Sequence, residues 1–350
     1  MNANAKGKRD LGGPAQPLLT VRKLVRHFPV KGSLGRKAVV RAVDGISFTV
    51  LKGETLGVVG ESGCGKSTTA RLLMQLIEQD SGELIFDAVE VGSHQLPLRE
   101  FRRQVQMVFQ DSYSSLNPRL TIEQSVAFGP KVHGVSGKDS LARARDLLAR
   151  VGLEPSRFAG RYPHELSGGQ RQRVNIARAL ALEPRLVILD EAVSALDKSV
   201  EAQVLNLLLD LKQSLDLTYV FISHDLHVVR YLSDRILVMY LGEVVEVGPA
   251  EALFTGACHP YTRALLSSMP SMDPERRTEA SPLSGDPPSP IDPPEGCRFH
   301  TRCPHAEPVC STRKPPLQPT GEAHVAACLM VVPGGGHSCS PPAERLAKEA

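Results

Sequence analysis

The sequence predicts an α/β fold with a mostly parallel sheet, followed by a C-terminal segment of different composition. Short apolar runs alternate with stretches of helical spacing up to about residue 265, which is typical of a parallel sheet covered by helices. One of these runs ends in a glycine-rich loop that leads into a helical stretch. Residues 271–296 then hold seven prolines in 26 positions, so we expect an extended linker there, and clustered cysteines follow it.

The predicted elements follow one another in a regular order. A short apolar run that ends in glycine or an acidic residue is typical of a buried parallel strand. The spacing of Leu73, Leu76 and Ile77 places them on one face of a helix. We expect strands and helices at these positions: short strands within 19–50, joined by a basic turn (PVKGSLGRKAV), a strand at 55–60, a helix at 66–79, an amphipathic helix at 140–153, and strands at 186–190 and 218–223.

Composition limits the class of protein. Hydrophobic residues make up 41% of the 350 residues and charged residues 23%, which is ordinary for a soluble globular chain. The net charge of +3 comes from 41 basic and 38 acidic residues, and this balance gives no reason to expect nucleic acid as a partner. The first 16 residues lack an apolar signal region, and no apolar run approaches the roughly 18 residues of a membrane span. We therefore expect a cytoplasmic chain that leaves membrane work to other subunits.

The stretch GESGCGKST, residues 60–68, matches the phosphate-binding pattern G-x-x-x-x-G-K-[ST]. Glycines let backbone N–H groups turn toward phosphate oxygens, and the helix that follows adds its positive end. Lys66 would reach the β- and γ-phosphates of ATP, and Ser67 would hold Mg²⁺. A glycine-rich turn is the alternative, but the strand before the loop and the helix after it favour a nucleotide site. The predicted phosphate-binding residues are Gly60, Ser62, Gly63, Cys64, Gly65, Lys66, Ser67 and Thr68.

A second stretch, LVILDEA, supplies carboxylates at the end of a buried strand. Asp190 would complete the Mg²⁺ shell, and Glu191 would orient or deprotonate the attacking water. Taken alone, an apolar run that ends in Asp-Glu is more often a strand end facing solvent. Together with the upstream loop it completes a nucleotide site.

A third stretch, ELSGGQRQR, repeats the phosphate-binding chemistry about a hundred residues later. Ser167, Gly168 and Gly169 stand where a helix begins, and bare N–H groups there favour an anion. The alternative is an N-cap followed by a solvated basic helix face.

These motifs together resemble the ATP-binding cassette (ABC) family, whose signature is LSGGQ, here ending at Gln170. The resemblance covers roughly residues 18–265. It implies a RecA-like P-loop core, an antiparallel β subdomain and an α-helical subdomain at about 111–165. It also implies a head-to-tail dimer in which the signature of one chain acts on the nucleotide of the other.

The resemblance also implies roles for residues outside the three stretches. Phe28 would stack on adenine, and His224 would touch the γ-phosphate. Gln110 would sense Mg²⁺ together with Ser67 and Asp190, and it would face the membrane subunits. The loop that crosses the dimer interface would be formed by Ser194, Ala195, Leu196 and Asp197.

Finer features resemble the oligopeptide/dipeptide importer ATPases. They are FQDSYSSLNPRLTI, LDEAVSALD, the HPYTRALLSSMP stretch with His259, Pro260 and Tyr261, and the proline- and cysteine-rich extension. The resemblance implies a peripheral ATPase at the cytoplasmic face of the inner membrane. Its expected partners are a second ABC ATPase (identical or different), two transmembrane permease subunits and an external substrate-binding protein. Nickel or sugar import, or a soluble regulatory ATPase, are the alternatives.

Four cysteines in the extension form a candidate metal site. Intervening segments of five, six and 17 residues separate them, with no C-x-x-C pair, so the pattern is not a standard zinc ribbon. Four thiolates could hold a [4Fe–4S] cluster or zinc, or remain free, and the resemblance favours iron. The four residues are Cys297, Cys303, Cys310 and Cys328. The expected organisation is a flexible N-terminus (1–17), the ATPase domain (18–265), the extension (266–335) and a flexible tail (336–350).

Overall fold

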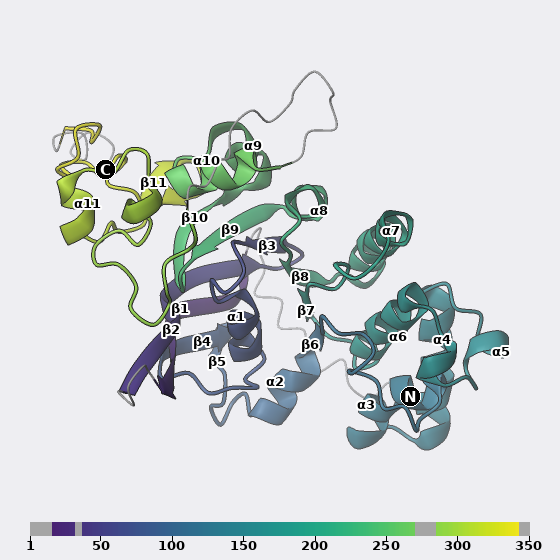
Figure 1. The fold of residues 1–350 in the computed structure, drawn as a ribbon. Coiled ribbons are helices and arrows are strands. Elements are labelled where there is room, and N and C mark those ends of the chain that lie inside the picture. The colour runs from purple at the N-terminus through teal and green to yellow at the C-terminus, as the bar shows by residue number, and fades with distance from the viewer. Residues whose placement is uncertain (1–15, 32–36, 270–284, 343–350) are drawn as a thin grey trace.

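The computed structural model describes residues 16–31, 37–269 and 285–342, arranged as Figure 1 shows. The strands are β1 (Pro17–Lys31), β2 (Lys37–Leu51), β3 (Thr55–Val59), β4 (Ser81–Phe86), β5 (Val89–Glu90), β6 (Val105–Val108), β7 (Leu186–Asp190), β8 (Thr218–Ile222), β9 (Arg235–Tyr240), β10 (Glu243–Pro249), β11 (Gln318–Gly321) and β12 (His324–Ala326). The α-helices are α1 (Lys66–Leu73), α2 (Leu98–Gln104), α3 (Ile122–Val132), α4 (Gly137–Arg150), α5 (Pro155–Phe158), α6 (Gly168–Leu180), α7 (Lys198–Leu215), α8 (Leu226–Leu232), α9 (Ala250–Gly256), α10 (Pro260–Ser267) and α11 (Pro308–Thr312). Two 3₁₀ turns are η2 (Pro163–Glu165) and η3 (His300–Arg302).

The larger sheet confirms the predicted mostly parallel architecture. Its eight strands run in the order β11-β12-β10-β9-β3-β8-β7-β6, and the pairs from β9 to β6 are parallel. Every residue of β3, β7 and β8 is buried, as expected for strands covered on both faces. Because these three strands are parallel neighbours, the loops that leave their carboxyl ends meet at one edge of the sheet.

Alternate residues of these strands belong to two different hydrophobic clusters. Val187 and Leu189 of β7 pack with the helices α4, α6 and α7. Leu186 and Ile188 pack with α1 and the smaller sheet. Because successive side chains of a strand point to opposite faces, the same sheet contributes to both hydrophobic clusters.

The smaller sheet is antiparallel, in the order β2-β1-β4-β5. The prediction of short strands within residues 19–50 was wrong in length, because β1 and β2 have 15 residues each and pair along their lengths. Register shifts, with Lys23 at φ +45°, absorb irregular positions without ending the strand. Residues 32–36, at the predicted turn, lie outside the described residues.

The helix after the phosphate loop is shorter than predicted. It ends at Leu73, and Gln75 has φ +53°, a left-handed conformation that an α-helix cannot continue. Leu76 is 48% exposed and so does not belong to the expected apolar face. The amphipathic helix predicted at 140–153 is α4, which packs against α3 and α6 in the helical region on the right of Figure 1.

The extension joins the main sheet. Strand β12 pairs with β10, matching Glu246 with Ala326 and Val247 with Val325. Described residues continue to 342, and His337 within them is buried, its Nε2 2.8 Å from His305 O. The segment predicted as a linker lies partly outside the described residues, which resume at 285.

None of the helices in the described ranges has both the length and the apolar character that a bilayer span needs.

Candidate nucleotide-binding site

The phosphate loop connects β3 to α1 and leaves no room for side chains at two of its glycines. Gly65 has φ +107°, and a Cβ there would stand 2.2 Å from Ala42 O. A Cβ on Gly60 would stand 2.2 Å from Met239 O. The loop is therefore pressed against β2 and β9, with its backbone in the conformation that turns N–H groups inward.

Lys66 is held inside this loop. Its side chain is buried, and Nζ donates to Gly60 O at 2.6 Å and to Glu61 O at 3.0 Å. Cys64 is also buried, and burial raises the pKa of its thiol, so it is uncharged at neutral pH. Cys64 is thus a small, uncharged side chain enclosed by the loop.

Ser67 and Asp190 meet, as the sequence predicts. Ser67 Oγ donates to Asp190 Oδ1 at 3.1 Å, which joins the first turn of α1 to the end of β7. Burial raises the pKa of Asp190, and the hydrogen bond from Ser67 opposes that shift. A hydroxyl and a carboxylate are oxygen ligands of the kind Mg²⁺ prefers, and a cation would stabilise the charged carboxylate.

Glu191 lies between the other two predicted catalytic residues. Gln110 Nε2 donates to Glu191 Oε2 at 2.8 Å, and His224 Nδ1 is 3.6 Å from Oε1. The backbone of Glu191 has φ +47°, and its N–H donates to Ile222 O at 2.9 Å, which ties it to the end of β8. The structure thus gathers carboxylate, amide and imidazole beside the phosphate loop. Gln110 binds Glu191 here and not the Ser67–Asp190 pair.

The signature and the interface loop form a second group. Ser167 caps α6 and accepts from Gln170 N, while the Gln170 side chain accepts from Ser167 N at 3.0 Å. A Cβ on Gly169 would stand 2.4 Å from Val200 Cγ1, and Asp197 caps α7 by accepting from Val200 N at 3.0 Å. In Figure 1 α6 stands apart from α1, with β6 and β7 between them.

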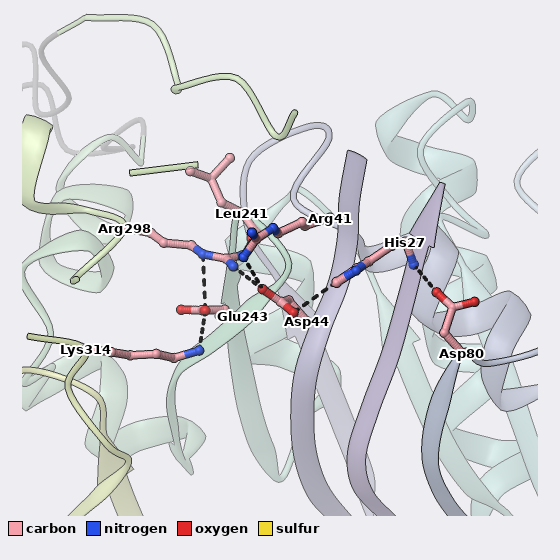
Figure 2. Close-up of polar contacts among 8 residues, drawn as sticks. All are labelled: His27, Arg41, Asp44, Asp80, Leu241, Glu243, Arg298 and Lys314. Carbon is pink, nitrogen blue, oxygen red and sulfur yellow. Dashed lines mark hydrogen bonds and ion pairs between the residues drawn. The ribbon is translucent and has the colours of Figure 1, made fainter. Parts of the chain in front are cut away.

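Phe28 lies on β1, half-buried, with the Arg26 guanidinium 4.8 Å from its ring centroid. Its neighbour His27 contacts Asp44 Oδ1 at 3.0 Å through Nε2 and donates its backbone N–H to Asp80, as Figure 2 shows. Stacking of Phe28 on adenine stays a prediction.

The four cysteines of the extension line one cavity. Burial and the neighbouring thiols raise the pKa of Cys297 to about 12 and that of Cys328 to about 11. Among described residues, the only three His, Cys or acidic ligand atoms within 4.8 Å of one another belong to Glu246, Cys258 and His324. No three of the four thiol sulfurs therefore lie within 4.8 Å of one another, whereas the sulfurs around one tetrahedral zinc are roughly 3.8 Å apart.

Sequence reasoning missed a contact of the phosphate loop: Glu61 within the loop binds Arg302 and Tyr261. Glu61 Oε2 and Oε1 accept from Arg302 Nη1 and Nη2 at 2.8 and 3.1 Å, and Glu61 N donates to the Tyr261 hydroxyl at 2.9 Å. Two sequence patterns contain the partners of Glu61. CRFHTRC places two arginines between two cysteines, and the HPYTR stretch contains Tyr261.

Comparison with known proteins gives consistent matches. A family model described as ABC transporter matches residues 43–194, and one described as oligopeptide/dipeptide transporter, C-terminal region, matches residues 245–310. The chain is 50% identical to a probable peptide ABC transporter ATP-binding protein, y4tS of Sinorhizobium fredii, over 93% of each chain. It is 47% identical to the oligopeptide transport ATP-binding protein AppF of Bacillus subtilis, over 89% of this chain and 97% of that one. Among solved structures, the dimeric ATP-binding cassette MJ0796 in a post-hydrolysis state with ADP and Pi is 29% identical, with a TM-score of 0.59 over 66% of this chain and 98% of that one.

Proposed function

The chain belongs to the ATPases of ABC transporters that carry an oligopeptide/dipeptide transporter C-terminal region, and from this premise we propose that it powers the import of di- and oligopeptides across the cytoplasmic membrane. The observation that carries the proposal is one chain with a catalytic carboxylate beside a phosphate loop and an extension of the importer type joined to the same sheet. The names of its relatives, a peptide ABC transporter ATP-binding protein and an oligopeptide transport ATP-binding protein, support peptides as the cargo.

The geometry supports specific roles at the nucleotide. The loop N–H groups bind phosphate oxygens. Lys66 Nζ, which donates to two loop carbonyls in this structure, donates instead to the β- and γ-phosphates when ATP is bound. Ser67 and Asp190 hold Mg²⁺, which when bound neutralises phosphate charge. Glu191 accepts a proton from the attacking water, and Gln110 and His224, both beside its carboxylate, orient that water.

The signature serves the ATP of a partner chain. Its helix, α6, stands apart from α1 within this chain, and a related cassette is dimeric. In the proposed dimer, Ser167–Gln170 and the loop of Ser194–Asp197 face the partner's phosphates, and Phe28 stacks on the adenine of its own site. ATP binding closes the dimer and hydrolysis reopens it.

The remaining partners follow from an importer. Two transmembrane permease subunits receive the motion near Gln110, and an external binding protein delivers the peptide. Exposed apolar side chains near Gln110 and on α3 support a docking surface there: Phe109, Tyr113 and Phe128. The chain would then be peripheral, at the cytoplasmic face of the membrane, and its second ATPase is a copy of itself or a related chain.

The extension holds a [4Fe–4S] cluster in this proposal. The residues fit such a group: four thiols line one cavity, and no three of their sulfurs lie within 4.8 Å of one another, as they would around a single zinc ion. When bound, the cluster supplies four metal–thiolate bonds that cross-link the extension. The four thiols would have to lose their protons first, and burial raises the pKa of Cys297, Cys303 and Cys328.

Uptake of labelled di-, tri- and pentapeptides tests the function in cells that lack their own copy of the chain. Wild type should restore ATP-dependent uptake of at least one length class. The Glu191→Gln variant should still bind ATP yet restore less than about a hundredth of that uptake, because the water loses its base. Equal uptake with wild type and with no added chain, in cells without a redundant system, would contradict peptide import and direct the search to nickel or sugars.

A further inference from the structure

Glu61, the second residue of the phosphate loop, is held at all of its polar groups. Its N–H donates to the Tyr261 hydroxyl at 2.9 Å, and its carbonyl accepts from Lys66 Nζ at 3.0 Å. Its carboxylate receives both guanidinium arms of Arg302, at 2.8 and 3.1 Å. A planar fork that binds both oxygens fixes orientation as well as distance, so the loop has a defined position before nucleotide arrives.

The Arg302–Glu61 pair is partly buried. The Arg302 side chain is 5% exposed and that of Glu61 22%, so solvent screens this pair far less than a surface ion pair. Arg302 Nη1 also donates to the Tyr240 hydroxyl at 3.4 Å. Phe299 packs edge-on against Tyr240 and Tyr261, each at 5.4 Å between ring centroids, and keeps η3 against the loop.

A second arginine of the same segment, Arg298, contacts the turn at Leu241 beside the loop. Arg298 donates to Leu241 O and to Asp44, and its Nε is 3.1 Å from Glu243. Figure 2 shows Arg298 between Asp44 and Glu243, with Lys314 also on Glu243. The turn at Leu241 and Gly242 contacts the loop, because Gly242 N donates to Cys64 O at 2.9 Å.

We propose that Arg302 is a positioning residue for the phosphate loop, and that the segment from Cys297 to Cys303 thereby sets the affinity for ATP. The inference rests on the proposed role of this loop in binding ATP. Arg302 acts directly on Glu61, whereas Arg298 acts through Asp44 and the turn at Leu241. The extension thus supports the nucleotide site by contacting the side chain of Glu61 in the phosphate loop.

The test measures the Kd of the full chain for a fluorescent ATP analogue, together with KM and kcat for ATP. Arg302→Met should raise Kd and KM about tenfold and leave kcat within about twofold, because the loss falls on ground-state binding. Arg302→Lys should raise both by only about threefold, since an ammonium restores the charge but not the fork. Glu61→Gln should match Arg302→Met, and the double variant should be no worse than either single variant.

Arg313→Met is the matched control. Arg313 donates to Gly334 O and Gly335 O, both within the extension, so its loss perturbs the extension without touching the loop. Its Kd should equal that of wild type. An unchanged Kd in Arg302→Met, an equal rise in Arg313→Met, or a double variant with multiplied effects would overturn the inference.

Lys66→Met separates this inference from the proposed function. Suppose that wild type binds ATP, that Lys66→Met abolishes this binding and that Arg302→Met leaves it unchanged. Only the role of Arg302 would then be overturned. A wild-type chain that binds no ATP would overturn both.

Discussion

At the scale of single residues, burial determines which groups carry charge. His259 is buried, and burial lowers its pKa to about 3, so the imidazole is neutral in the folded chain. Its Nδ1 accepts from Tyr261 N at 3.0 Å and caps α10, and its ring lies 5.8 Å from that of Phe299. A neutral imidazole therefore sits at the joint between the ATPase domain and the extension.

This burial predicts a pH dependence of stability. The folded pKa lies below the unfolded value of about 6.5, so the unfolded state gains the proton first as the pH falls. The stabilisation is present above pH 6.5 and is lost toward pH 3, at about 1.4 kcal/mol per pH unit. Urea unfolding at pH 5.5 and 4.5 should show this loss in wild type beyond the loss in His259→Asn, which keeps a capping acceptor without a titrating ring. Parallel curves for the two proteins would show that His259 is not the cause.

At the scale of elements, the start of α6 carries two roles in one turn. Ser167 and Gln170 cap each other's N–H groups, and Gly169 lets the helix approach Val200 of α7. The cap fixes the helix within its own chain, and in the proposed dimer the other N–H groups of this first turn face an anion of the partner chain.

The shared site in a dimer predicts complementation between two defective chains. In a dimer of Lys66→Met with Ser167→Arg, both defects fall in the same site, so the other site is intact and about half of the wild-type ATPase rate should remain. In a dimer of wild type with a chain carrying both changes, each site has one defect, and hydrolysis should nearly vanish. Purified mixed dimers with two different affinity tags allow the rates to be compared. The opposite ranking would mean that each chain uses its own signature.

The elements also show what a sequence can predict. The strands β3, β7 and β8 were predicted almost residue by residue, because a buried parallel strand is a continuous apolar run that its own residues reveal. The end of α1 was missed because Leu76 continues the apolar spacing, although Gln75 adopts φ +53°. The Ser67–Asp190 pair followed from motifs, whereas the Arg302–Glu61 pair joins positions 241 residues apart that no local pattern connects.

At the scale of the whole molecule, the extension is tied to the ATPase domain by buried polar contacts. Glu246 of β10 is fully buried, accepts from Cys258 N and His259 N, and lies 2.8 Å from His324 Nε2. A carboxylate that is satisfied in this way holds β10, the start of α10 and β12 together. The four-cysteine cavity lies beside this joint, lined also by His259.

A resident cluster predicts that metal and structure are lost together. Chain purified without oxygen should be brown and contain about four irons per chain. Cys303→Ser should contain far less iron and expose residues 285–342 to protease, because a metal cross-link of the extension is gone. Cys258→Ser is the control, since Cys258 is outside the four-cysteine cavity, and it should keep its iron. Colourless, iron-free wild-type protein from that preparation would exclude the cluster.

The contacts of Arg302 and Arg298 have a consequence for building chimeras. The MJ0796 cassette aligns over 98% of its own length with 66% of this chain, so about a third of this chain has no counterpart in that cassette. In this chain the extension binds Glu61 of the phosphate loop through Arg302 and Asp44 of β2 through Arg298. If residues 285–342 were grafted onto a shorter cassette, the recipient would need acidic residues at the positions of both Glu61 and Asp44. A version of this chain trimmed at Ser267 would keep every catalytic motif and still hold its ATP loosely.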